Sequence, residues 1–149
     1  MNFKIELANE KDVIDVFNLS NDELVRKMSI ITDEIDFKTH EEWFYKAIND
    51  KNCDFFVIKD ENDLIGQVRF EKKEAEIIVS ISISKKYRGF NLSYIILQEC
   101  MQKSKFKNFV AYIKPENIAS IKIFEKLNYQ FDREIFINNI KLLKYKFGE

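Results

Sequence analysis

The segment that most restricts the fold of this chain is an alternating strand that runs directly into a basic turn and a helix. Apolar and polar residues alternate between Ala75 and Ser84, which is typical of a half-buried strand. The turn at 85–89 then carries three basic residues and Gly89, and apolar positions recur at helical spacing to about Lys103. A helix start collects unpaired backbone N–H groups, and Gly lets backbone approach a ligand closely. This junction therefore predicts an anion site, such as a phosphate site, on an α/β core.

The order of elements along the chain indicates a mixed, mostly antiparallel sheet with helices on both faces. An antiparallel meander in the middle is followed by a strand–helix–strand crossover, which brings in a parallel pair. No linker or repeat divides the sequence, so we expect one α/β domain over 1–149. Strands are expected at 3–7, 53–59, 64–71, 75–84, 108–113, 131–137 and 140–147, and helices after Asn9 and at 39–50, 91–103 and 118–127, with a short helix and a loop between 20 and 37.

Capping signals locate the helix ends. Asn9 is a cap for the first helix, and Thr39 with Glu42 forms a Thr-x-x-Glu capping box for the second. Asn117 is expected to cap the last helix, with Asn128 left-handed at its end and a tight hairpin turn at 138–139. The inward sides are expected to be Val13, Ile14, Val16 and Phe17 in the first helix, and Trp43, Phe44 and Ala47 in the second.

The overall composition excludes several classes of protein. The 149 residues are 46% hydrophobic with a formal net charge of −1, whereas nucleic-acid binders usually carry a basic excess. Cys53 and Cys100 lack metal-ligand spacing and indicate free thiols, and His40 is the only histidine, so we expect no metal site. No stretch approaches the ~20 apolar residues that span a bilayer, and no leader is apparent. We therefore expect a cytoplasmic protein that binds neither nucleic acid nor membrane.

Two motifs resemble the GNAT acetyltransferase family. Residues 81–93 resemble its acetyl-CoA segment, where the strand end bonds the pantetheine arm and the turn holds the pyrophosphate. The family pattern Arg/Gln-x-x-Gly-x-Gly/Ala begins at Arg88, but Asn91 and Ser93 replace its Gly positions. Asn tolerates left-handed backbone and Ser is small, so the turn remains possible. Residues 117–129 resemble the family's Asn-x-x-Ala/Ser…Phe/Tyr-x-Lys-x-Gly-Phe helix.

This resemblance implies a GNAT-like acyl-CoA N-acyltransferase fold and an acetyl-CoA-dependent transfer to a primary amine. The cofactor-binding residues that it implies are Ile81, Ser82, Ile83, Arg88, Gly89, Phe90, Asn91, Leu92, Ser93, Asn117, Ser120 and Phe124. Asn117 is equally well explained as a helix cap, and Phe124 as a core residue.

Catalysis in such an enzyme needs a neutral amine, a stabilised oxyanion and in many cases a base. Strand alternation places Glu76 and Ser82 on one side, and we take them as catalytic candidates, with Glu76 as the base. By resemblance, a backbone N–H near Ile83 serves the oxyanion. Many relatives carry a Tyr as general acid where Phe124 stands, so that role is absent or moved. Substitutes in principle are Tyr129, Tyr94 and Tyr87, although a thiol has a far lower pKa than an alcohol, so a thiolate can leave without a dedicated acid.

The first two helices resemble amino-sugar N-acetyltransferases of the pseudaminic-acid pathway type. The resemblance implies a nucleotide-linked amino-deoxy sugar as acceptor, with Arg26 or Lys27 near its phosphates and His40 or Trp43 near the sugar or base. Each residue also has an ordinary structural explanation as a solvated or packed side chain. Two other functions stay open: acetylation of protein N-termini, as in ribosomal-protein acetyltransferases, and a degenerate binding module. A homodimer is also possible for such domains.

Overall fold

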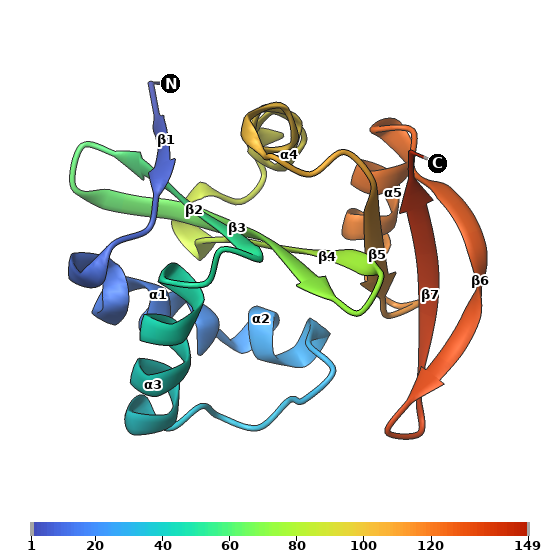
Figure 1. Cartoon of the computed structure of the whole chain (residues 1–149), viewed down its shortest axis with the longest axis horizontal. Helices are drawn as coiled ribbons and strands as arrows, with labels where there is room; N and C mark the ends of the chain where they lie inside the picture. Colours follow the sequence, from blue (N-terminus) through green and yellow to red (C-terminus); the bar gives the residue numbers. More distant parts are fainter. Residues whose placement is uncertain (1, 149) are drawn as a thin grey trace.

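The computed structural model describes residues 2–148 and contains a seven-stranded sheet with helices on both faces (Figure 1). The strand order is β1-β2-β3-β4-β5-β7-β6, and β4 and β5 are the parallel neighbours, whereas the other neighbours are antiparallel. The expected mixed, mostly antiparallel sheet is confirmed. The strands are β1 (Lys4–Leu7), β2 (Cys53–Asp60), β3 (Asp63–Lys73), β4 (Glu76–Ile83), β5 (Phe109–Ile113), β6 (Gln130–Ile137) and β7 (Ile140–Phe147).

The helices divide between the two faces of the sheet. The 3-10 turn η1 (Glu10–Asp12), α1 (Val13–Ser20), α2 (Glu23–Met28) and α3 (Phe37–Ile48) precede β2; η2 (Lys85–Tyr87) and α4 (Leu92–Lys103) follow β4, and α5 (Ile118–Lys126) follows β5. Figure 1 shows α1, α2 and α3 on one side of β2–β4 and α4 on the other. This division follows from strand alternation, because successive side chains of β2 enter different cores. Phe56 and Ile58 pack with α4, while Phe55 and Val57 pack with α1 and α3.

The sheet opens between β4 and β5. Figure 1 shows β2–β4 running across the view, whereas β5 and β7 stand nearly upright. Within the described residues, Ile78↔Val110 is the one register pair that joins β4 to β5, while β3 and β4 pair from Lys73↔Glu76 to Gly66↔Ile83. We call the space between β4 and β5 beyond Ile78 and Val110 the fork.

Backbone groups of β4 point into the fork. Ser84 N–H donates to the carbonyl of Ile65 at 2.8 Å, so the even-numbered residues of β4 bond to β3. In an antiparallel ladder the bonding direction alternates with each residue. The N–H groups of Ile81 and Ile83 therefore point away from β3, towards β5. A strand that presents unpaired N–H and C=O groups can pair with an extended ligand.

Most asparagine signals are confirmed by the backbone. Asn117 accepts from Ser120 N–H at the start of α5, and Asn128, at φ 70°, follows α5. The β6–β7 turn has φ 52° at Asn138 and 64° at Asn139, as the type I′ turn requires.

Three details of the sequence prediction are wrong. Helix α3 begins at Phe37 and is capped by Asp36, which accepts from Thr39 N–H at 3.0 Å, so Thr39 lies inside the helix. Ile14 is 58% exposed, and Leu19 takes part in the buried side of α1 instead. The longest strand is β3 rather than β4.

Candidate active site

The turn after β4 has the backbone geometry that the sequence motif implies. Asn91 lies at φ 57° and ψ 26°, the left-handed region, directly before α4. Gly89 also has a positive φ of 87°, and a Cβ at this position would meet no atom within 4 Å. Gly89, Phe90 and Asn91 are exposed. The N-terminus of the 12-residue helix α4 and this turn therefore offer backbone N–H groups to an anion at the edge of the fork.

The side chain of Arg88 points into the protein. Its Nε donates to the Ile83 carbonyl at 3.0 Å, and its Nη2 lies 2.5 Å from Oδ2 of Asp22. Asp22 is the N-cap of α2 and also accepts from Leu24 N–H at 3.1 Å and Val25 N–H at 3.2 Å. The Arg88 side chain thus links the turn to α2. The cofactor contacts that we expect near Arg88 fall to the backbone of the turn.

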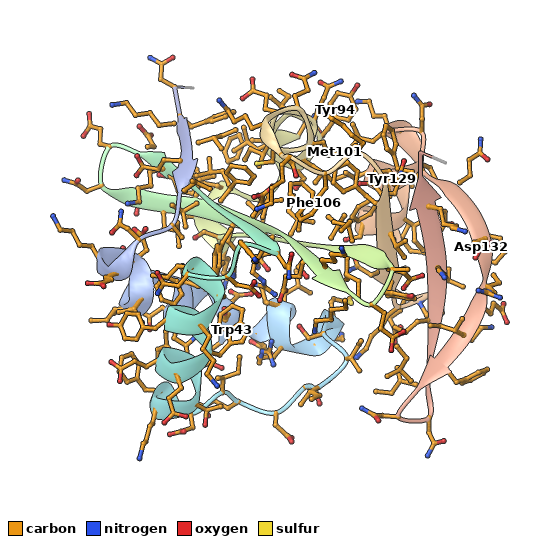
Figure 2. All side chains as sticks on the ribbon, in the orientation of Figure 1. Trp43, Tyr94, Met101, Phe106, Tyr129 and Asp132 are labelled. Carbon is orange, nitrogen blue, oxygen red and sulfur yellow. The ribbon has the colours of Figure 1, made fainter. Side chains whose placement is uncertain are left out.

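The start of α5 lies on the other side of the expected cofactor path. The side-chain oxygen of Asn117 accepts from Ser120 N–H at 3.3 Å, so Asn117 is a helix cap, and Ser120 is half-buried. Phe124 is only 3% exposed, and its ring packs edge-on against Tyr129 with centroids 4.8 Å apart. The Tyr129 hydroxyl lies 3.5 Å from the sulfur of Met101 (Figure 2). Phe124 and Tyr129 are therefore core residues in this structure.

A polar cluster joins β4, β5 and β7 on the opposite face of the sheet. Tyr112 donates its hydroxyl proton to Glu76, and Lys144 Nζ lies 2.6 Å from Oε2 of Glu76 and 4.0 Å from Asp132. The Lys144 ammonium, followed by the Tyr112 hydroxyl, lowers the pKa of Glu76 below its ordinary value. Burial, together with the hydrogen bond to Glu76, raises the pKa of Tyr112. Lys144 is 6% exposed, and the half-buried Glu76 is its near counter-ion.

Glu76 lies on the closed side of the fork. It precedes Ile78, whereas Ile81 and Ile83 lie on the open side. Glu76 and Ile83 are seven positions apart along β4, which is about 23 Å at 3.3 Å per residue. Glu76 and a reacting centre at Ile83 are too far apart for direct proton transfer, so these two expectations do not fit together. Ser82 lies on the same face as Glu76, near the open end, opposite the buried Gln67.

Comparison with known proteins identifies the class of this site. Residues 3–130 match the model of the acetyltransferase (GNAT) domain. The chain belongs to the GNAT acetyltransferase family. The expectation of an acyltransferase enzyme is therefore confirmed, and the degenerate binding module loses support.

Solved structures show the same fold. The chain is similar to a spermidine N-acetyltransferase from Vibrio cholerae in complex with CoA and spermine, at 17% identity and TM-score 0.84, covering 97% of this chain and 94% of that one. It is also similar to an N-acetyltransferase from Staphylococcus aureus Mu50, at 19% identity and TM-score 0.82, covering 99% of this chain and 98% of that one. A putative acetyltransferase from Salmonella typhimurium with acetyl-CoA gives 16% identity, TM-score 0.81, and coverage of 99% and 94%. No curated protein matches the chain.

The residues expected to bind the acceptor of this GNAT domain do not share one open surface. His40 is 2% exposed, with its Nε2 2.9 Å from the Val13 carbonyl, and burial lowers its pKa. Trp43 is half-buried and stacks against Arg69, 4.8 Å from its guanidinium carbon, on the α3 side of the sheet (Figure 2). Lys27 is exposed. Ligand contact by His40 would require the helices around it to move.

The side chain of Arg26 forms several hydrogen bonds within the protein. Its Nε donates to Ser20 O at 2.7 Å, and its Nη1 donates to Ile31 O at 2.9 Å and Asp33 O at 3.3 Å. Its Nη2 lies 3.2 Å from Ser29 Oγ. The side chain thus organises the loop after α2. Binding a sugar-nucleotide phosphate would compete with these bonds.

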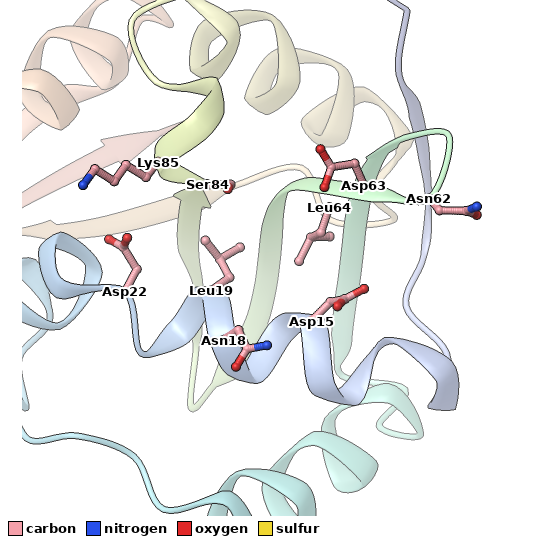
Figure 3. Close-up of a pocket in the computed structure, with 9 residues that line it drawn as sticks. All are labelled: Asp15, Asn18, Leu19, Asp22, Asn62, Asp63, Leu64, Ser84 and Lys85. Atoms are coloured by element: carbon pink, nitrogen blue, oxygen red, sulfur yellow. The ribbon is translucent and has the colours of Figure 1, made fainter.

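A cavity of about 270 Å³ lies between α1 and the adjoining ends of β3 and β4 (Figure 3). Figure 3 shows Asp22 and Lys85 at one end of it and Asp15 and Asp63 towards the other. Asp22 pairs with Arg88, and Asp63 accepts from Lys86 at 2.9 Å and Tyr87 at 2.5 Å. The full lining is Asp15, Asn18, Leu19, Asp22, Asn62, Asp63, Leu64, Ser84 and Lys85.

Sequence reasoning missed four polar residues that form contacts between distant elements around β4, β5 and α2: Asp22, Tyr112, Lys114 and Lys144. Strand parity was the available signal for Tyr112 and Lys114, because both alternate with buried residues of β5. Their partners were not predictable, since these come from α2 and β4.

Among residues 2–148 no group of three or more His, Cys, Asp or Glu is placed to hold a metal ion. No helix in the same range has the length and apolar character that would let it cross a membrane.

Proposed function

We propose that this enzyme transfers the acetyl group of acetyl-CoA to the primary amine of a small, cationic molecule. The fork carries this proposal. The N–H groups of Ile81 and Ile83 point into it, and the left-handed turn at Asn91 lies at its open end. An extended pantetheine arm fits beside β4 as an added strand, with its pyrophosphate at the start of α4. The fold neighbours with CoA and acetyl-CoA support this choice of cofactor.

The chain's own part in the reaction is to orient the two partners. Acetyl-CoA supplies the thioester: the neutral amine forms a C–N bond to its carbonyl carbon, the C–S bond breaks, and the proton lost by the nitrogen is taken up by the departing CoA thiolate or by water. The N–H of Ile81 is the oxyanion donor that we favour. Among the N–H groups that point away from β3, that of Val79 lies beside the paired residue Val110, and that of Ile81 is the next one, on the open side. Positioning of this kind accounts for a large part of the rate in bimolecular transfers. Glu76 is occupied by Lys144 and Tyr112, so we do not assign it as the base.

The charges around α2 favour a cationic acceptor over a sugar nucleotide. The Arg26 side chain is hydrogen-bonded to Ser20 and to the loop after α2. Of the two residues expected to bind a phosphate, Lys27 is therefore the one that remains exposed. The exposed carboxylates of Asp33 and Glu34 lie in the loop that Arg26 ties to α2, and the exposed Asp15 lines the same cavity as Asp22. Spermine in the Vibrio cholerae structure is a precedent for a polyamine on this fold. The nucleotide-linked amino sugar is our second candidate, and a protein N-terminus the third.

A panel assay tests these acceptors. The purified chain is incubated with acetyl-CoA and, separately, spermidine, a UDP-linked 4-amino-4,6-dideoxy sugar, and a peptide with the N-terminus of a ribosomal protein; released CoA thiol is measured. Turnover that is highest with spermidine is expected. Turnover only with the sugar nucleotide would make the second candidate correct, and turnover only with the peptide the third. If calorimetry detects no acetyl-CoA binding, the proposed function is wrong.

Two further expectations stay proposals. Strand β6 is an edge of the sheet and exposes Phe131 (52%) and Phe136 (68%), so we propose it as the contact in a homodimer. Light scattering of the wild type and of Phe136→Asp tests this: a dimer that the variant converts to a monomer is expected. The cytoplasmic location stays a prediction.

A further inference from the structure

Helix α2 is fastened at both ends to side chains that come from the two sides of the fork. At its N-terminus, Oδ2 of the cap residue Asp22 accepts a hydrogen bond from Nη2 of Arg88 at 2.5 Å. At its C-terminus, the carbonyl oxygen of Lys27 accepts a hydrogen bond from Nζ of Lys114 at 2.9 Å. Arg88 follows β4, and Lys114 directly follows the last residue of β5. One short helix therefore connects the two strand ends.

This arrangement places α2 across the open end of the fork. A helix of six residues is about 9 Å long, which suits a bridge between neighbouring strands that have begun to separate. Figure 1 shows α2 beside β4 with its far end towards β5, on the face opposite α4. Lys114 is 8% exposed, so its ammonium group is enclosed at this contact rather than moving freely in solvent.

The loop after α2 is tied to the helix. Arg26 bonds to the carbonyls of Ile31 and Asp33 and to Ser29 Oγ, and Asn21 bonds both ways with the backbone of Ile35. A displacement of α2 must therefore carry this loop with it. The loop and helix lie on the face from which an amine would reach a thioester held in the fork.

We propose that α2 is a positioning element whose place depends on the contents of the fork, and that Lys114 and Arg88 are the positioning residues that set it. This role of α2 rests on the proposed function, because it needs an acetyl-CoA arm in the fork. An arm inserted between β4 and β5 changes the separation of the strand ends, and α2 is bonded to both. Cofactor binding then fixes the helix and its loop for the amine. Lys114 acts through α2 and touches neither the cofactor nor the reacting atoms.

Hydrogen exchange of the α2 amides with and without acetyl-CoA tests this without knowledge of the acceptor. In the wild type, acetyl-CoA is expected to slow exchange across residues 23–28 by about fivefold or more. Lys114→Met is expected to bind acetyl-CoA with a Kd within about threefold of the wild type but to lose the response in α2. Lys114→Arg should restore the response, because it keeps a cationic donor. Lys73→Met, at an exposed lysine at the end of β3, is the matched control and should respond like the wild type.

Each outcome decides the proposal. Unchanged exchange at α2 in the wild type despite measured acetyl-CoA binding would overturn it, as would a full response in Lys114→Met. If Lys114→Met does not fold, Asp22→Asn removes the ion pair at the other attachment and must reduce the response. With the best amine of the panel, Lys114→Met should raise the amine KM about tenfold at a nearly unchanged kcat, whereas general destabilisation would not separate the two. Failure of acetyl-CoA to bind at all is a separate result, which removes the proposed function.

Discussion

Arg88 and Asp22 are 66 positions apart in the chain and form an ion pair whose Nη2–Oδ2 distance is 2.5 Å. Burial opposes ionisation of Asp22, but the hydrogen bonds from Arg88 and from Val25 N–H outweigh it, and the pKa of this carboxyl lies below its ordinary value. The pair joins the turn after β4 to the cap of α2. A residue that the sequence motif assigns to the cofactor therefore also sets the start of the acceptor-side helix.

Replacing Asp22 by Asn should lower the free energy of unfolding by about 1–3 kcal/mol at pH 7, since Arg88 and two amides of α2 lose a charged acceptor. A lowered folded-state pKa gives stability that is present above the unfolded pKa and is lost as pH falls through the folded pKa. The difference between wild type and Asp22→Asn should therefore shrink below about pH 4. Urea unfolding at pH 7 and pH 3 measures it, with Asp15→Asn as the control from the same cavity. An equal difference at both pH values would contradict the assignment.

Asn91 should tolerate Gly but not Ala. Its φ of 57° costs a residue with a Cβ about 1–2 kcal/mol, from which Gly is free and Asn partly so. Asn91→Ala is expected to lose stability and acetyl-CoA affinity together, and Asn91→Gly to match or exceed the wild type in both. Thermal unfolding with and without acetyl-CoA provides both readouts. Equal behaviour of the Ala and Gly variants would show that the left-handed turn is unimportant.

The alternating strands and the asparagine turns were predictable because their signals are local. The dipeptide at 138–139 and the cap at Asn117 depend on neighbouring residues alone, and both are confirmed. The start of α3 was not predictable, since Asp36 and Thr39 are both good caps. Asp36 is the cap because its carboxylate accepts hydrogen bonds from both the backbone N–H and the hydroxyl of Thr39, which places Thr39 inside the helix.

Site residues were harder to predict than strands, since their partners lie far away in sequence. An imidazole such as that of His40 is a common ligand contact, yet the His40 ring is packed among the rings of Phe17, Trp43 and Phe44. Glu76 was a candidate base because of its position in the alternation of β4, but the residues that contact it, Tyr112 and Lys144, come from β5 and β7. Strand parity assigns a residue to a face of the sheet, and only the register of β7 brings Lys144 beside Glu76.

Removing the charge of Glu76 should damage stability more than catalysis. Glu76→Gln leaves the buried Lys144 with only the more distant Asp132 as counter-ion. Because the Glu76 side chain is 30% exposed, the expected loss is about 1–3 kcal/mol, below that of a fully buried pair. The pH–rate profile should keep its shape, because Glu76 lies on the closed side of the fork. The double variant Glu76→Gln with Lys144→Met is the control, and it should recover part of the lost stability. Loss of the basic limb of the profile in Glu76→Gln would instead identify Glu76 as the base.

Restoring the family's tyrosine at position 124 should not restore a general acid. Phe124 is 3% exposed and packs with Tyr129 and Leu127 in the core beneath α5. A hydroxyl added there would be buried among apolar groups, at a cost of about 1–3 kcal/mol if it finds no partner. Phe124→Tyr is therefore expected to unfold at lower urea concentration and to leave kcat within about twofold, since a thiolate leaves readily without a proton donor. Phe124→Leu is the matched control, as it disturbs packing without adding a polar group. A kcat that rises only in Phe124→Tyr would mean that position 124 faces the departing sulfur.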